Sequence, residues 1–129
     1  MYRLSAHSEI QTQVVDAGSV ASLNKLTYAS SALIRKYAIM TLCNISAHPV
    51  NQPRMADHGC ITPVIDLLGD AEEVVSRYAA MTATNLASDP NNQLVIPKLG
   101  GLPPLIKLAS QVGSESSRYA GTIHTLYTL

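Results

Sequence analysis

Apolar residues recur along this chain at steps of three and four, and no stretch alternates between apolar and polar residues at every second position. The first spacing is that of amphipathic α-helices, whereas strict alternation would indicate β-strands. The pattern predicts short helices at about 10–17 and 20–28. It predicts long helices at about 31–47, 71–88 and 114–129. The sequence therefore predicts an all-α fold.

The helical pattern repeats every 41 residues. The glycines Gly18, Gly59 and Gly100 are separated by this step. Tyrosine, glutamine, alanine and basic residues keep the same phase, and coincidence does not explain so many rare residue types in register. The sets are Tyr37, Tyr78 and Tyr119; Gln11, Gln52 and Gln93; Ala38, Ala79 and Ala120; and Lys36, Arg77 and Arg118. The chain is therefore predicted to be built from copies of one helical unit.

We predict a single repeat domain over residues 1–129, with units at about 7–47, 48–88 and 89–129. Residues 1–6 match the end of a long helix and are predicted to be the remnant of a preceding unit. Repeat proteins bury the face of each unit on its neighbours, and their end units normally carry polar caps. Neither end of this sequence shows one. We therefore expect a piece of a longer array, or a homo-oligomer that associates through the uncapped ends.

Glycine, proline and acidic residues mark the predicted helix boundaries. Gly18 is predicted to end the first helix in the left-handed conformation or to allow a close helix crossing. Pro63 falls in a first helical turn, where its missing N–H has no partner within the helix. Asp70 and Glu73 have the spacing of a capping box at the start of a long helix. Each unit is thus expected to hold two short helices and one long one.

A unit of this length and helix order resembles the armadillo (ARM) repeat, whose superfamily includes β-catenin, importin-α and vacuolar protein 8. The similarity is carried by residues 17–20, 58–68 and 83–88, which include the glycine between the short helices and the Asn-Leu pair late in the long helix. The resemblance implies a right-handed superhelix of α-helices, an armadillo-repeat solenoid of about three units. It also implies a non-catalytic scaffold that binds an extended peptide segment of another protein in a concave groove lined by the third helices.

The resemblance assigns peptide contact to an asparagine near the end of the third helix, and Asn44 and Asn85 match that position. A carboxamide offers both a donor and an acceptor, so it can pair with a peptide main chain whatever the ligand's side chains are. The alternative is that each asparagine fixes the following loop or the neighbouring third helix. Unit three lacks the asparagine and has Leu126 there.

On a helical projection of ~100° per residue, Tyr37 and Tyr78 lie on the same stripe as the asparagines, and Tyr119 is their equivalent in unit three. Aromatic rings on a groove give a ligand large contact area at small entropic cost. The alternative is that each ring packs between adjacent third helices, and both can hold together. Met40 and Met81 take the position at which nuclear-import adaptors of this family carry Trp. The absence of Trp disfavours the binding of basic import signals.

Three basic residues, Lys36, Arg77 and Arg118, lie about 80° from the asparagine stripe on the same projection. They predict contact with acidic side chains of a partner. The alternative is a solvated flank, or pairing along the helix as between Arg77 and Glu73. His124, on the last long helix near the groove, either contacts the ligand or fills the edge of the groove.

Composition and charge argue against nucleic-acid binding and membrane insertion. Nine Lys and Arg balance nine Asp and Glu, so the chain lacks the positive field that nucleic-acid binding usually needs. No apolar run approaches the ~20 residues of a membrane span, and the start of the sequence lacks a secretory signal. We therefore expect a cytoplasmic protein, and a nuclear location is also compatible with these features. Cys43 and Cys60 sit in apolar segments and are expected to be reduced structural thiols.

No spacing in the sequence matches a nucleotide, metal or catalytic motif, so we expect no enzyme activity, no cofactor and no metal. The alternative to peptide binding is an architectural segment whose asparagines and tyrosines serve only packing between units. High exposure of these side chains favours the peptide-binding groove, whereas burial and bonding to one another favour the architectural role.

Overall fold

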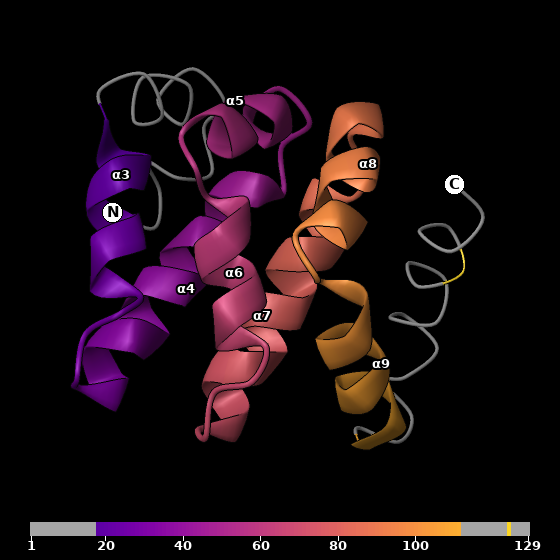
Figure 1. The fold of residues 1–129 in the computed structure, drawn as a ribbon. Coiled ribbons are helices and arrows are strands. Elements are labelled where there is room, and N and C mark those ends of the chain that lie inside the picture. Colours follow the sequence, from indigo (N-terminus) through magenta and orange to yellow (C-terminus); the bar gives the residue numbers. More distant parts are fainter. Residues whose placement is uncertain (1–17, 112–123, 125–129) are drawn as a thin grey trace.

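The computed structural model describes residues 18–111 and residue 124 of the chain. Over this part it contains seven helices and no strand. Figure 1 shows them following one another across the molecule, from α3 on one side to α9 on the other. Their bounds are α3 (Ser19–Leu26), α4 (Ala32–Ser46), α5 (Asn51–Asp57), α6 (Ile61–Leu67), α7 (Glu73–Leu86), α8 (Pro90–Lys98) and α9 (Leu102–Gln111). The all-α prediction is confirmed, while the predicted helices 10–17 and 114–129 lie outside the described residues, apart from helical His124.

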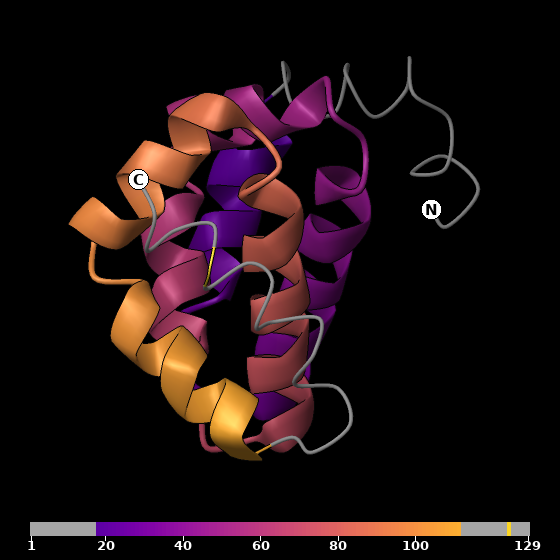
Figure 2. The ribbon, with the colours of Figure 1, turned by 90° about the vertical axis from the view of Figure 1, so that its right-hand side faces the viewer.

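Two short helices followed by one long helix form the structural module of this chain. Helices α5, α6 and α7 make one complete module; α3 and α4 are the last two helices of the module before it. Helices α8 and α9 are the first two of the module after it. Figure 2, viewed from the α9 end, shows the later helices in front of the earlier ones. The described part is a helical solenoid.

The three glycines of the 41-residue repeat hold the turn before the second helix of each module. Their φ angles are +82° at Gly18, +79° at Gly59 and +86° at Gly100. A Cβ at any of the three would meet no atom within 4 Å. The left-handed backbone, and not a close helix crossing, is therefore the reason for glycine at these positions.

One hydrophobic core runs through all the modules. It includes fully buried side chains from α4, α7 and α9, such as Leu42, Leu86 and Leu105, and Met55 from α5. Helices α4 and α7 pack directly against each other. The apolar positions at three- and four-residue steps in the sequence supply these buried faces, as the pattern predicts.

The start of α7 differs from the prediction. The residue before the helix is Glu72, whose side chain makes no capping hydrogen bond, so the Asp70 and Glu73 capping box is wrong. The carboxylate of Asp70 accepts the backbone N–H of Glu72 at 2.9 Å and forms an ion pair with Arg35. Because a residue of another module holds this carboxylate, it does not reach the N–H of Glu73.

Buried amides close the ends of the long helices. The Nδ2 of Asn51 donates to the carbonyl of Ile45 at 3.1 Å, and the Nδ2 of Asn92 donates to that of Leu86 at 3.0 Å. Carbonyls in the last turn of a helix lack partners within it, so a buried helix end needs such donors. The adjacent glutamines do the same: Gln52 Nε2 donates to the Ser46 carbonyl at 3.0 Å, and Gln93 Nε2 to the Ala87 carbonyl at 2.8 Å. The glutamine repeat in the sequence is therefore structural.

Candidate functional site

The predicted stripe of the third helices lies on two neighbouring helices, and we call it the α4–α7 face. On α4 it consists of Leu33, Tyr37, Met40 and Asn44, and on α7 of Val74, Tyr78, Met81 and Asn85. Each set is spaced by three or four residues, which places its members on one side of the helix.

The α4 half of the face is open. The side chains of Leu33 and Tyr37 are 58% and 59% exposed, and Asn44 is exposed as well, whereas Met40 is half-buried. A large aromatic ring and a leucine next to each other in solvent form a surface that can lose water on binding a partner.

The α7 half is more closed. Val74 is 46% exposed, but Tyr78 packs against the core, and Met81 and Asn85 are only partly exposed. The Nδ2 of Asn85 donates to the hydroxyl of Ser46 at 3.1 Å and lies 3.5 Å from the carbonyl of Cys43. Asn85 therefore ties its helix to the neighbouring third helix, which is the packing role left open by the sequence. Its equivalent Asn44 is exposed, so the two asparagines differ in their surroundings.

The two described basic residues of the predicted shoulder have different neighbours. The Nη2 of Arg77 lies 2.9 Å from a carboxylate oxygen of Glu73, one turn earlier on α7. The pairing along the helix that the sequence offered as an alternative thus occurs at Arg77. Lys36 is half-buried, and its Nζ lies 5.9 Å from the ring centroid of Tyr37, within the range of a cation–π contact.

The remaining predicted site residues fall largely outside this surface. Tyr119 and Arg118 lie outside the described residues. His124 is exposed and helical. Within the described part of the chain, the candidate site is therefore assembled from α4 and α7.

Side chains that the sequence analysis did not single out join α3 and α4 to the next module. The guanidinium of Arg35 is bonded to the carboxylate of Asp70, with 2.8 Å between Nε and Oδ1, and the hydroxyl of Tyr28 donates to Asp66. Neither pair recurs 41 residues later, because Ser76 stands at the position equivalent to Arg35 and Gly69 at that of Tyr28. In the sequence these pairs are marked by a break in the repeat. A comparison that looks for recurring residues does not detect such a break.

Both cysteines are buried, and no disulfide joins them. Burial raises the pKa of the Cys60 thiol to about 12, since a thiolate is costly away from water. A thiol held in this form is a poor nucleophile. Within residues 18–111, and including His124, no group of three or more His, Cys, Asp and Glu residues is placed to hold a metal ion. None of the helices in the described part is both long and apolar enough to span a bilayer.

A family model described as Armadillo-like matches residues 19–103, well over half of the chain. The chain belongs to this armadillo-like family. The matched region runs from α3 into the start of α9. The armadillo-like solenoid that the resemblance implied is thereby confirmed.

Several solved structures similar to this armadillo-like chain are engineered proteins. A designed armadillo repeat protein superposes with a TM-score of 0.86 at 25% identity, over 95% of this chain and 53% of the design. An engineered protein of the Northeast Structural Genomics Consortium matches with a TM-score of 0.85 at 28% identity, over 97% of this chain and 52% of its own. A further designed armadillo repeat protein, in complex with the peptide (KR)4, has a TM-score of 0.83 at 25% identity, over 96% of this chain and 53% of its own.

The chain spans about half the length of these structures. No curated protein is significantly similar to it in sequence.

Proposed function

We propose that this armadillo-like chain is a non-catalytic scaffold that binds an extended segment of a partner protein on the α4–α7 face. The observation that carries the proposal is the exposure of Tyr37 at 59%, beside Leu33 at 58% and exposed Asn44 on the same side of α4. A rigid ring, an aliphatic side chain and a carboxamide on one helix provide apolar contact and main-chain hydrogen bonding together.

One structural relative supports the class of ligand. The designed armadillo repeat protein that superposes over nearly all of this chain was solved with a basic peptide, (KR)4. We propose a peptide ligand here too, but of acidic or neutral character. Lys36 stands beside Tyr37, and this positive charge disfavours a basic peptide. Arg77 contributes less to this preference, because Glu73 balances its charge.

The proposal is tested by selecting random peptides on the full chain and measuring the enriched peptides by fluorescence anisotropy. We expect Tyr37→Ala to weaken binding by at least about tenfold, as for a tyrosine at the centre of an interface. We expect Asn44→Ala to weaken it by about threefold to tenfold, the value of one or two hydrogen bonds.

Control variants on α8 test whether a loss of affinity is specific to the α4–α7 face. Leu94→Ala and Asn91→Ala remove an exposed leucine and an exposed asparagine from α8, and we expect neither to change the affinity. Lys36→Glu is expected to weaken acidic peptides more than neutral ones. If Tyr37→Ala and Leu94→Ala bind the selected peptides equally well, the α4–α7 face is not the binding surface.

An architectural role is the second candidate, and the hydrogen bond of Asn85 to Ser46 of the neighbouring long helix favours it. It requires that no selected peptide depends on Tyr37 or Asn44, while Asn85→Ala lowers the unfolding free energy. Peptide binding by the Asn85→Ala variant with unchanged affinity would show that the two roles are divided between α4 and α7.

A further inference from the structure

Two junctions between modules can be compared residue by residue in this structure. In the first junction, α3, the loop that follows it and the start of α4 meet α6 and Asp70. In the second junction, α6, the loop that follows it and the start of α7 meet α9. Residues 19–35 and α6 have equivalents 41 positions later in the second junction, so the side chains at equivalent positions can be compared directly.

The first junction is bridged by hydrogen bonds from two side chains, Tyr28 and Arg35. The hydroxyl of Tyr28 donates to the carboxylate of Asp66 on α6. The guanidinium of Arg35 is bonded through Nε and Nη2 to the two carboxylate oxygens of Asp70, at 2.8 and 3.3 Å. Its Nη1 also donates to the carbonyls of Ala29 and Ser30, each at 3.0 Å. Two hydrogen bonds of the guanidinium thus cross this junction, and the other two hold the loop between α3 and α4.

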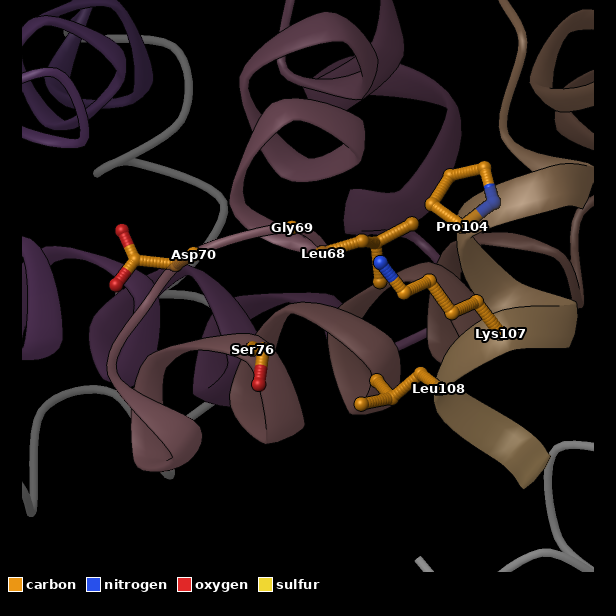
Figure 3. Close-up of a pocket in the computed structure, with 7 residues that line it drawn as sticks. All are labelled: Leu68, Gly69, Asp70, Ser76, Pro104, Lys107 and Leu108. Atoms are coloured by element: carbon orange, nitrogen blue, oxygen red, sulfur yellow. The ribbon is translucent and has the colours of Figure 1, made fainter. Parts of the chain in front are cut away.

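The second junction is hollow. Gly69 and Ser76 replace the tyrosine and the arginine, and a cavity of about 230 Å³ lies beside them. Figure 3 shows its walls: Leu68 from the α6 end, Ser76 from α7, and Pro104 and Leu108 from α9. The two leucines are buried, so the cavity has an apolar wall. The hydroxyl of Ser76 donates to the carbonyl of Glu73 at 2.9 Å, so its proton is already engaged within α7.

The charge at this place is reversed between the two junctions. Lys107 stands at the position equivalent to Asp66, and Figure 3 shows its side chain extending across the cavity with the nitrogen toward Leu68. Lys107 is exposed, and no ion pair forms with it among residues 18–111. Asp70 also borders the cavity, but its carboxylate points away in Figure 3 and is bonded to Arg35 and to the N–H of Glu72. The charge available to a ligand is therefore the ammonium of Lys107.

We propose that the cavity of the second junction binds one apolar side chain of a partner polypeptide, with an adjacent carboxylate paired to Lys107. The volume is below the roughly 300–1,000 Å³ of pockets that enclose whole small ligands, and it suits a single side chain. The first junction indicates an aromatic group, because Tyr28 stands at the position equivalent to Gly69 and its hydroxyl reaches Asp66, the equivalent of Lys107, while its ring is 57% exposed. The reversed charge indicates the charge of the ligand group. The ammonium of Lys107 pairs with an acceptor, whereas the carboxylate of Asp66 at the equivalent position pairs with a donor. This surface is separate from the α4–α7 face, so either can fail without the other.

Three small probes that differ in charge but share a phenyl ring test the proposal on the full chain. N-acetylphenylalanine carries a carboxylate beside the ring, N-acetylphenylalaninamide is neutral, and phenylalaninamide is cationic. Methyl NMR titration follows the signals of Leu68 and Leu108. We expect the carboxylate probe to bind with a dissociation constant on the order of 1 mM, as its size allows. It should bind about threefold more tightly than the neutral probe, the effect of one solvent-exposed ion pair. The cationic probe should bind more weakly than both.

Two variants with opposite expectations accompany the titration. Gly69→Tyr places a tyrosine beside the cavity, at the position that Tyr28 has in the first junction. Gly69 does not have a positive φ, and a Cβ there would meet only the carbonyl of Asp66 at 4.0 Å, so a side chain fits. This variant should abolish binding of all three probes. Lys107→Glu should leave the cavity open and reverse the order of the probes, with phenylalaninamide becoming the tightest. Lys98→Met removes an exposed lysine from α8 and should change nothing.

Several results would overturn the proposal. Equal affinity for the three probes would remove the role of Lys107. Unchanged binding to Gly69→Tyr, or shifts confined to methyl groups other than those of Leu68 and Leu108, would place the probes elsewhere. If Gly69→Tyr does not fold, Lys107→Glu alone decides, because an unchanged order of the probes in that variant contradicts the predicted ion pair.

Discussion

The two junctions between modules are built from equivalent helices and differ in the side chains that meet across them. In the first, Tyr28 and Arg35 extend from one module and are bonded to acidic residues of the next. In the second, Gly69 and Ser76 leave an apolar hollow beside Lys107. The comparison shows that a junction between armadillo-like modules can be bridged by polar side chains or can contain a cavity. The buried apolar core holds the helices in place in both cases.

The largest expected effect concerns the ion pair that only the first junction has. Arg35→Met should lower the unfolding free energy by about 3 kcal/mol, since it leaves a mostly buried carboxylate and two carbonyls without their donor. The side chains of Arg35 and Asp70 are only 18% and 9% exposed, so water replaces little of the loss. Chemical denaturation measures the change.

The matched substitution in the second junction is Ser76→Ala. It removes one hydrogen bond to the carbonyl of Glu73 and should cost about 0.5–1 kcal/mol. Similar losses for Arg35→Met and Ser76→Ala would mean that the two junctions are equally stable and that the ion pair contributes nothing beyond packing.

The next effect comes from the buried asparagines. Asn92 donates to the carbonyl of Leu86 and also to that of Gln52 in the preceding module, whereas among residues 18–111 Asn51 donates to the carbonyl of Ile45 alone. Asn92→Ala should therefore lower the unfolding free energy by about 2–3 kcal/mol and Asn51→Ala by about 1–2 kcal/mol. Thermal and denaturant unfolding of the two variants checks the order, and a larger loss at Asn51 would contradict it.

A smaller, stabilising effect is expected when the second junction is given the side chains of the first. The double variant Gly69→Tyr with Lys107→Asp recreates the pair formed by Tyr28 and Asp66. We expect a gain of about 0.5–1 kcal/mol, partly because a residue other than glycine lowers the entropy of the unfolded chain. Gly69→Ala serves as the control that separates this entropy from the new contact. A loss of stability in the double variant would show that the hollow does not accommodate a ring.

The smallest effect concerns pH at the first junction. Partial burial of the phenol, and then its hydrogen bond to the carboxylate of Asp66 and the charge of that carboxylate, raise the pKa of Tyr28 to about 12. The folded chain therefore holds this proton more tightly than the unfolded chain, whose tyrosines titrate near pH 10. The contribution to stability is complete below pH 10 and is lost as the pH rises from 10 to 12.

Ultraviolet titration of the full chain and of Tyr28→Phe measures this effect. The wild type should contain one tyrosine with a pKa about 2 units above the ordinary value, and the variant should lack it. Unfolding measured between pH 9 and 12 should fall more steeply for the wild type. An identical dependence in both proteins would show that the phenol of Tyr28 does not stabilise the first junction through its proton.

Much of the fold follows from features that a single sequence displays. The glycine of each turn, the helical apolar spacing and the 41-residue step depend on local chemistry repeated in each unit, so a single sequence displays them. The choice at these glycines between a left-handed backbone and a close helix crossing came from the structure. The capping box at Asp70 failed for the opposite reason. Its carboxylate is engaged by Arg35, which lies 35 residues away and in another module, and a local pattern carries no information about such a partner.

Only part of the candidate site could be predicted from the sequence. The sequence places Asn44 and Asn85 at equivalent positions and offers two roles for both. The structure shows Asn85 bonded to Ser46 of the neighbouring long helix and Asn44 exposed. Equivalent residues differ here because their surroundings come from adjacent modules, whose side chains are not identical.

The amino-acid sequence by itself determined the helices, their order and the repeat, because helix spacing and glycine turns are properties of short segments. Only the tertiary structure decided which equivalent residues are buried, which are exposed and where a cavity remains. Those outcomes depend on the volumes and charges that meet across a junction, such as Arg35 against Asp70 in one place and Ser76 beside Lys107 in the other.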